Sequence, residues 1–245
     1  DGLIADVSHP FFFSFLVDDR AKTCLSLLER FDRVKVVIDS VGEQSFLERF
    51  PTVGASLQVV PYVTDVPLPF GPWRTLKGPD YAVLSESTHL LAKKRSIRDK
   101  ADRILVTCGG SDPTCLTTGI MASIQELSDP VELTVVIGPL FSSEFANEIR
   151  KLAHSGRHPA KVVESPSSLT ELMVWSDITI ATSGLTKYEL AATGTPAIVM
   201  SIDSFHDKVN QPFADLGSVV DIGHRWASQR LVNEVDQLRQ NQQRR

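Results

Sequence analysis

The fold of this chain is decided by the stretch Asp177-Ile-Thr-Ile-Ala-Thr-Ser-Gly-Leu-Thr-Lys-Tyr-Glu189. An apolar run at residues 178–181 stops at Ser183-Gly184, and a segment with a helical pattern follows at once, at residues 186–193. Gly194-Thr195-Pro196 then ends that segment. This order predicts a strand, a tight turn and a helix. In open α/β sheets such a turn lies at the carboxyl end of its strand, which is where these sheets bind ligands.

The same turn has a functional and a structural interpretation. A helix start offers unpaired N–H groups and the positive end of the helix dipole to a phosphate, and Gly184 would let the backbone approach it closely. Glu189, one turn into the helix, could accept hydrogen bonds from a ribose. Alternatively, Thr186 and Glu189 have the spacing of a capping box, in which two side chains satisfy the N–H groups of a helix start. The local pattern leaves both interpretations open.

The composition is ordinary for a globular protein. The chain has 245 residues, of which 42% are hydrophobic and 22% charged, and it is long enough for one large or two modest domains. Its formal net charge of −5 gives no indication of nucleic-acid binding. No apolar run approaches the roughly 20 residues that a membrane-spanning helix needs. The 6 histidines show no metal-binding spacing, so neither a metal ion nor another cofactor is implied.

The cysteines and the start of the chain bear on where the protein works. Cys24, Cys108 and Cys115 form neither a CxxC motif nor a paired framework, which indicates a reducing compartment, and we expect a cytoplasmic protein. No secretory signal is visible. Because the chain opens with Asp1-Gly2 and not with Met, we expect the front of a longer protein to be absent.

The second half of the chain alternates regularly between strand-like and helix-like segments. The expected strands are residues 104–108, 133–137, 161–164, 178–181, 197–202 and 219–222, and the expected helices are residues 114–127, 143–154, 169–175, 186–193, 207–216 and 228–240. Short apolar runs bounded by helices are typical of a parallel sheet that is covered on both faces. We therefore predict a complete doubly wound parallel-sheet domain over residues 101–245.

The first half has fewer such segments. Three strands are expected, at residues 3–7, 34–39 and 57–62, with a helix at residues 21–30. Between residues 63 and 100, four prolines break any regular element, and the basic cluster Lys93-Lys94-Arg95 suits a solvated connection. We therefore predict a partial N-terminal α/β domain and an interdomain connection over residues 1–100.

Two further turns follow expected strands of the second half. Gly109-Gly110 permits a tight turn, and Asp112-Pro113 offers a good N-cap followed by a residue that suits the first helical position. Asn210-Gln211 could reach a sugar or a phosphate. Either segment could equally serve only to turn the chain or to start a helix. With Ser183-Gly184, the glycine turn could hold the two sides of a nucleotide diphosphate.

Four motifs together resemble the GT-B nucleotide-sugar enzymes. They are Gly78-Pro-Asp-Tyr-Ala-Val-Leu84, Gly109-Gly110-Ser111-Asp112-Pro113, the segment at residues 183–196, and Asn210-Gln211. The best match is the UDP-sugar hydrolase family of pseudaminic acid biosynthesis, which releases UDP from the UDP conjugate of a diacetamido-trideoxyaltrose. The N-acetylglucosaminyltransferases that form lipid II resemble the chain more distantly. The resemblance covers nearly the whole chain, but its motifs are specific only in the second half.

The resemblance implies a UDP-sugar as ligand and a set of residues that contact it. Ser183, Gly184 and Thr186 would hold the pyrophosphate, and Glu189 would hold the ribose. Gly109 and Gly110 would line an interdomain cleft. Asn210 would lie near the sugar or phosphate.

The chain departs from this family where the catalytic base should be. The family's N-terminal domain begins with a glycine-rich loop carrying a His, taken as the base that activates water, and this sequence has no such loop. His9 is the histidine that could substitute, next to Asp6-Val7-Ser8, where the family has a D-x-Y pattern. Three functions therefore stay open: a UDP-sugar hydrolase, a GT-B glycosyltransferase, and a nucleotide-sugar-binding homologue or fragment without catalysis.

Overall fold

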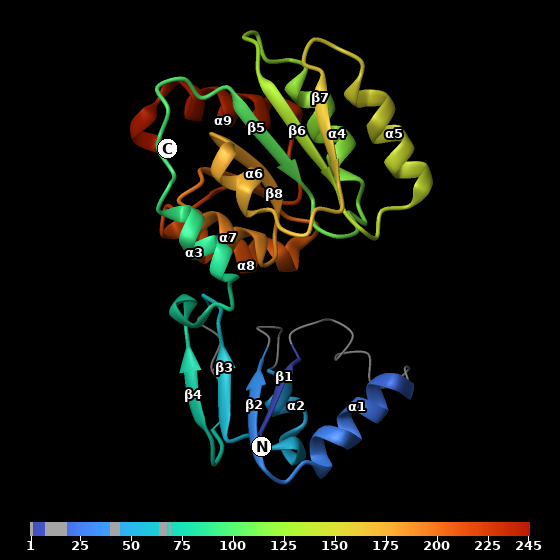
Figure 1. Ribbon diagram of the computed structural model, residues 1–245, viewed down its shortest axis with the longest axis vertical. Coiled ribbons are helices and arrows are strands. Elements are labelled where there is room, and N and C mark those ends of the chain that lie inside the picture. Colours follow the sequence, from blue (N-terminus) through green and yellow to red (C-terminus); the bar gives the residue numbers. More distant parts are fainter. Residues whose placement is uncertain (1, 8–18, 40–44, 64–67, 69) are drawn as a thin grey trace. The chain divides into compact units, whose positions relative to one another are not determined.

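The computed structural model describes residues 2–7, 19–39, 45–63, 68 and 70–245 of the chain. The chain divides into two compact units, Asp1–Val83 and Leu84–Arg245, and each contains its own parallel sheet (Figure 1). Each unit also has its own cluster of buried apolar side chains. Within the described residues, no helix is both long enough and apolar enough to cross a membrane.

Among its described residues, the first unit forms a parallel sheet of four strands in the order β1-β2-β3-β4. Its elements are β1 (Gly2–Asp6), α1 (Asp19–Arg30), β2 (Val34–Ile38), α2 (Phe46–Arg49), η2 (Pro51–Val53), β3 (Leu57–Val60), β4 (Arg74–Lys77) and η3 (Pro79–Tyr81). The three strands and the helix that the sequence predicts here are confirmed. The sequence did not predict β4, because this strand is only 4 residues long and lies between Pro72 and Pro79. Prolines are tolerated beside an edge strand, where a missing N–H interrupts no ladder.

The second unit, which the structure describes throughout, is a doubly wound α/β domain. Its parallel strands have the order β10-β9-β8-β5-β6-β7. The strands are β5 (Arg103–Thr107), β6 (Glu132–Ile137), β7 (Ala160–Glu164), β8 (Ile178–Thr182), β9 (Ala197–Met200) and β10 (Val220–Asp221). The helices are α3 (Glu86–Ala92), α4 (Leu116–Ile124), α5 (Ser143–Ala153), α6 (Thr170–Trp175), α7 (Thr186–Thr193), α8 (Ser204–Asp215), α9 (Ser228–Gln240) and η4 (Gln242–Arg244). Every strand and helix predicted for this unit is confirmed, with ends shifted by a few residues.

Helices cover the second sheet in two layers, and this burial explains its apolar strands. α4 packs against α5 and α9, whereas α6 packs against α3 and α7 (Figure 1). β8 is consequently buried along its whole length. A strand covered on both faces is apolar at every position, which is why the sequence shows continuous apolar runs here and no alternation.

The strand order contains one point at which the chain reverses its direction across the sheet. From β5 the chain runs outward through β6 to β7, and it then returns to β8 on the other side of β5. The loops that follow β5 and β8 therefore lead away in opposite directions. Doubly wound sheets bind ligands in the crevice between such loops, at the carboxyl ends of the two strands. The predicted turns at Gly109-Gly110 and Ser183-Gly184 are these two loops.

The division between the units differs from the one we expected. We assigned residues 1–100 to the first part of the chain, whereas the second unit already begins at Leu84. α3 packs against α6 and α7, and the Thr88 hydroxyl of α3 forms a hydrogen bond of 3.2 Å with the hydroxyl of Thr170. The segment that follows the prolines therefore belongs to the second unit by its packing.

The basic cluster of this segment also differs from the solvated connection that we expected. The Arg95 guanidinium donates to the carbonyl groups at the end of α6, at 3.0 Å to Met173, 3.3 Å to Val174 and 2.9 Å to Ser176. The last carbonyl groups of a helix have no partner within it. Arg95 supplies these partners from a distant part of the sequence.

Candidate functional site

The turns after β5 and β8 lie side by side at the point where the strand order reverses. Gly109 has a positive φ of 75°, which favours glycine, and a Cβ atom added there would lie 3.7 Å from Thr182 Oγ1 at the end of β8. The loop after β6 holds the first turn in place. A Cβ atom on Gly138 would lie 2.4 Å from the carbonyl oxygen of Gly109, and Leu140 N donates to the carbonyl oxygen of Gly110 at 2.8 Å. The turn at Gly109-Gly110 is therefore tightly fixed beside β8.

The helix after this turn begins later than the sequence predicted. We expected Pro113 at its first position, but α4 begins at Leu116, because Cys115 takes a left-handed backbone conformation with a φ of 54°. Asp112 still satisfies the helix start. Its carboxylate accepts hydrogen bonds from the N–H groups of Leu116 and Thr117, both at 2.9 Å. The first donors of α4 are thus occupied by the chain itself.

The start of α7 is open by contrast. Its N-cap residue is Leu185, and no side chain accepts a hydrogen bond there. The first N–H groups with a backbone partner are those of Tyr188 and Glu189, which donate to the carbonyl oxygen of Leu185 at 2.9 and 3.2 Å. Within the described residues, the N–H groups at 184–187 have no such partner. The capping box of Thr186 and Glu189 is therefore not formed, and these donors are available to a ligand.

Gly184 exposes this helix start. Its φ is 136°, a conformation that side chains rarely adopt, and a Cβ atom added to it would meet no described atom within 4 Å. The space in front of the turn is thus open. The backbone N–H groups can be approached closely, as the sequence predicted.

Glu189 is half-buried on the first turn of α7. Burial raises the pKa of its carboxyl group, and no hydrogen bond or ion pair with another described residue offsets this effect. A carboxylate without partners is costly to bury, so hydroxyl donors from a ligand would stabilise its ionised form. The position suits the ribose-binding role that the resemblance implies.

Asn210 lies beneath the turn and does not reach its surface. The side chain is fully buried, and its Nδ2 atom donates to Ser183 Oγ at 3.1 Å and to Ser201 Oγ at 3.0 Å. The structure thus places Asn210 behind Ser183, whereas we expected it beside the sugar or phosphate. Its neighbour Gln211 is exposed and donates to Asp215 on α8 at 2.7 Å.

Lys187 is a buried cation that the sequence analysis missed. Its Nζ atom donates to Asn210 Oδ1 and to the carbonyl oxygen of Val209, both at 3.0 Å, and lies 4.9 Å from the centre of the Phe213 ring. Burial lowers the pKa of the ammonium group to about 8. A lysine on a short helix is usually exposed, and the sequence of α7 has no clear apolar face that would mark the position of Lys187 as buried.

A second, partly exposed chain of polar groups was also missed. Asp207 accepts hydrogen bonds from the backbone N–H of His224, at 2.9 Å, and from its Nδ1 atom. Desolvation raises the pKa of Asp207, but hydrogen bonds from His224 and from Ser201 outweigh it and lower the pKa overall. Because Ser201 also contacts Asn210, these groups form one network along the carboxyl ends of β8, β9 and β10.

His9, the histidine considered as a base, lies outside the described residues. In the part of the chain that the structure describes, no group of three or more His, Cys, Asp or Glu side chains could hold a metal ion. The remaining predicted residues, from both glycine turns and the start of α7, all lie in the second unit.

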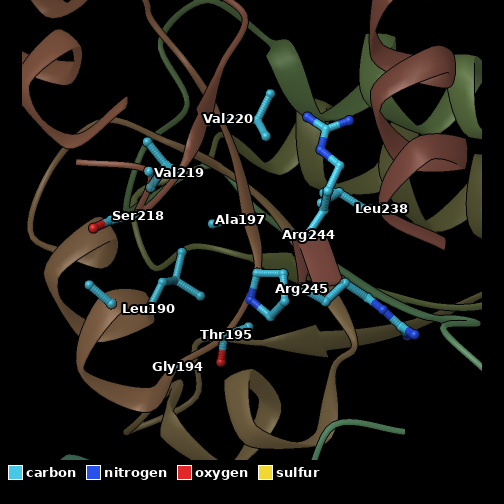
Figure 2. Close-up of a pocket in the computed structure, with 13 residues that line it drawn as sticks. Leu190, Gly194, Thr195, Ala197, Ser218, Val219, Val220, Leu238, Arg244 and Arg245 are labelled. Carbon is cyan, nitrogen blue, oxygen red and sulfur yellow. The ribbon is translucent and has the colours of Figure 1, made fainter. Parts of the chain in front are cut away.

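The pocket in Figure 2 lies at the opposite edge of the second sheet. It has a volume of about 210 Å³, and its lining includes Ala197 at the start of β9 and Val220 at the start of β10. Since the strands are parallel, these residues mark the amino edge, whereas Gly109 and Ser183 follow the carboxyl ends. Doubly wound sheets bind ligands at the carboxyl edge. We therefore assign the candidate site to the loops and not to this pocket.

Comparison with curated proteins identifies relatives of part of the chain. No protein-family model matches it. It is 26% identical over 153 residues to the spore coat polysaccharide biosynthesis protein SpsG of Bacillus subtilis (strain 168), covering 62% of this chain and 45% of that protein. It is also 26% identical over 142 residues to the UDP-N-acetylglucosamine--N-acetylmuramyl-(pentapeptide) pyrophosphoryl-undecaprenol N-acetylglucosamine transferase of Haemophilus influenzae (strain PittEE), covering 58% of this chain and 37% of that protein. The matched part of the chain spans less than half the length of these relatives.

Solved structures resemble the chain over most of its length. MurG of Acinetobacter baumannii superimposes with a TM-score of 0.60 at 15% identity, covering 91% of this chain and 62% of that one. The spinosyn rhamnosyltransferase SpnG, complexed with spinosyn aglycone, superimposes with a TM-score of 0.57 at 16% identity, covering 97% of this chain and 64% of that one. Together with the two parallel sheets, these similarities define a GT-B-like α/β fold, as the sequence predicted.

Proposed function

We propose that this chain binds a UDP-sugar at the carboxyl ends of β5 and β8. The observation that carries the proposal is the open start of α7, whose N–H groups at 184–187 lack partners among the described residues. A pyrophosphate would supply the missing acceptors, and the helix dipole would favour its negative charge. The hydroxyl groups of Ser183 and Thr186 would add further donors at its sides.

Glu189 would hold the nucleoside end of this ligand. Two ribose hydroxyl groups can donate to one carboxylate, which would offset the burial that raises the pKa of Glu189. The name of the Haemophilus influenzae relative describes a reaction of a UDP-sugar, and that of SpsG describes polysaccharide biosynthesis. Both names favour a nucleotide sugar over other anionic ligands.

The reaction that we propose is cleavage at the anomeric carbon of the sugar, as in the UDP-sugar hydrolases of pseudaminic acid biosynthesis. The bond between the anomeric carbon and the β-phosphate oxygen breaks, and UDP leaves with the electron pair. The N–H groups at the start of α7 would stabilise the charge that develops on the departing UDP. A base would take a proton from the attacking water. His9 is the candidate for this base.

A glycosyltransferase is the second candidate function. It would use the same UDP site and break the same bond, but a hydroxyl group of a second substrate would replace water. The observation that favours it is the similarity to a rhamnosyltransferase structure and to a named N-acetylglucosamine transferase. One fold serves both reactions, so the fold does not choose between them. A nucleotide-sugar-binding homologue without catalysis is the third candidate.

Two measurements test these proposals in sequence. Calorimetry with UDP, and with ADP as a control for the base, tests the site: a folded chain that binds neither would refute it. UDP release is then followed with the pathway's UDP-diacetamido-trideoxyaltrose. Release in water alone indicates a hydrolase, whereas release only after a sugar acceptor is added indicates a transferase. Binding of UDP without release in either case indicates a binding protein, and turnover that is lost in His9→Ala would assign the base.

A further inference from the structure

We propose that Lys187 is a positioning residue that makes Ser183 a hydrogen-bond donor to the phosphate of the ligand. The buried ammonium group would fix the orientation of the Asn210 amide, and this amide would in turn fix the direction of the Ser183 hydroxyl. The inference rests on the proposed nucleotide-sugar site, and it concerns a residue that lies behind that site.

The first step is the orientation of the Asn210 amide. An amide oxygen and nitrogen are distinguished by their hydrogen-bond partners. The Lys187 ammonium group can only donate, so the amide atom 3.0 Å from Nζ must be the oxygen Oδ1. The nitrogen Nδ2 must then face Ser183 and Ser201, with one hydrogen for each hydroxyl oxygen.

The second step is the direction of the Ser183 hydroxyl. Because Nδ2 donates to Ser183 Oγ at 3.1 Å, the hydroxyl oxygen is an acceptor in that contact and its hydrogen points elsewhere. The acceptor within the chain is the carbonyl oxygen of Met200, which lies 3.5 Å away and also accepts from Ser183 N at 3.2 Å. A hydrogen bond of this length is weak. A phosphate oxygen in front of the turn would be a stronger acceptor.

The third step is the charge itself. Both hydrogen-bond partners of Lys187 are neutral. Among the described residues no carboxylate forms an ion pair with it, and the charge that acts on it is that of Asp221, which raises its pKa less than burial lowers it. A buried cation without a counter-ion in contact is costly, and the contact with the Phe213 ring offsets this only in part. A diphosphate at the start of α7 would supply negative charge close to Lys187. The ligand and the lysine would therefore stabilise each other.

The same amide fixes a second branch of the network. Ser201 accepts from Asn210 Nδ2 and so donates to Asp207, which also accepts from His224. The ammonium of Lys187 is thus the one end of the network that can only donate, and the Asp207 carboxylate is an end that only accepts. The hydrogen bonds between them consequently have one direction, which the donor end at Lys187 and the acceptor end at Asp207 both favour.

Calorimetry on the full chain with UDP and with uridine tests this role. Lys187→Met removes the charge and the donor but keeps the length of the side chain. We expect it to weaken UDP binding about tenfold, which corresponds to roughly 1.4 kcal/mol. Uridine binding should change less than about twofold. Lys208→Met is the matched control, because Lys208 is exposed on α8, and it should leave both affinities unchanged. Equal losses for UDP and uridine, or none for UDP, would overturn the inference.

A double-mutant cycle tests whether Lys187 acts through Ser183. Ser183→Ala should weaken UDP binding in the wild-type chain and have little further effect in Lys187→Met, whereas additive losses would overturn the relay. If Lys187→Met does not fold, Asn210→Asp replaces it. That change gives Lys187 a counter-ion but leaves both side-chain oxygens as acceptors, so Ser183 must turn its hydrogen inward and UDP binding should again fall about tenfold. Wild-type UDP affinity in Asn210→Asp would contradict the inference.

The result also separates this inference from the proposed function. A wild-type chain that fails to bind UDP refutes the nucleotide-sugar site and this inference with it. A wild-type chain that binds UDP, with Lys187→Met binding it equally well, refutes only the role of Lys187.

Discussion

The helices α5 and α7 both follow strands of the second sheet and begin at its carboxyl edge, but their starts differ. At α5, Ser142 is the N-cap, and its hydroxyl oxygen accepts a hydrogen bond from Phe145 N at 3.2 Å. At α7, Leu185 takes that position and provides no side-chain acceptor. A good N-cap stabilises a protein by about 1 kcal/mol. The chain forgoes this stabilisation at α7, as it does at α6 and α9. The start of α7 also lies close to the glycine turn after β5, and our proposal is that a ligand completes it.

The change that should break this difference most strongly is Gly184→Asp. It places a carboxylate in front of the open N–H groups, where it takes the position of the phosphate and repels it. We expect UDP affinity to fall about 100-fold or more, or roughly 3 kcal/mol, in a calorimetric titration. Gly217→Asp is the matched control, since Gly217 also has a positive φ, of 70°, and open space around its Cβ position. If Gly184→Asp binds UDP as well as the control does, the ligand is not at α7.

The next largest effect concerns the buried cation of α7. Burial lowers the pKa of Lys187 from 10.5 to about 8, so between these values the unfolded chain binds more protons than the folded chain. The free energy of unfolding should therefore rise with pH across this window, by on the order of 2–3 kcal/mol from this group. Urea unfolding at about pH 7 and about pH 10 measures the rise, which should be absent from Lys187→Met. If the free energy of unfolding depends on pH identically in the two proteins, the pKa of Lys187 is not lowered in the folded chain.

Glu189→Ala distinguishes a ligand-binding residue from a cap. Loss of a hydrogen-bonded carboxylate should weaken UDP binding by about 1–3 kcal/mol. Because burial raises the pKa of Glu189, its ionisation lowers stability as the pH rises through that pKa, and the substitution should not destabilise the chain near neutrality. Glu171→Ala, at an exposed position of α6, serves as the control. A loss of thermal stability with unchanged UDP affinity would instead support the capping interpretation.

The smallest expected effects come from a matched pair of substitutions at the two helix starts. Ser142→Ala removes the cap of α5 and should lower the free energy of unfolding by about 1 kcal/mol without affecting UDP. Thr186→Ala should change stability by less than about 0.5 kcal/mol and weaken UDP binding by about 1 kcal/mol. Denaturant titrations and calorimetry on both variants give the comparison. If Thr186→Ala instead lowers the free energy of unfolding and leaves UDP affinity unchanged, Thr186 caps the helix.

Much of the fold could be predicted because the strands of the second sheet are buried on both faces and therefore appear as continuous apolar runs. The start and end of α7 were predicted correctly, since Ser183-Gly184 and Gly194 interrupt the pattern on both sides. β4 could not be predicted, because its sequence is Arg-Thr-Leu-Lys and prolines lie on both sides of it. The place of α3 was missed because its contacts are with α6 and α7, far along the sequence.

The site was predictable to the extent that it is local in sequence. The strand–turn–helix at Ser183-Gly184 and the glycine turn at Gly109 each lie within a few residues and carry their own pattern. Lys187 and Asn210 are 23 residues apart, and Asp207 and His224 are 17 residues apart. No periodicity links such pairs, because only the alignment of neighbouring strands brings them together. The polar network behind the turn therefore required the structure.

The proposal that UDP completes the open start of α7 is tested most directly by following backbone amide signals in an NMR titration with UDP. The N–H groups at residues 184–187 should shift and exchange more slowly with solvent as UDP is added, because they acquire phosphate acceptors. The N–H group of Phe145, which Ser142 already caps, should stay unchanged. UDP that binds without affecting residues 184–187, or a folded chain whose amide signals do not respond to UDP at all, would contradict the proposal.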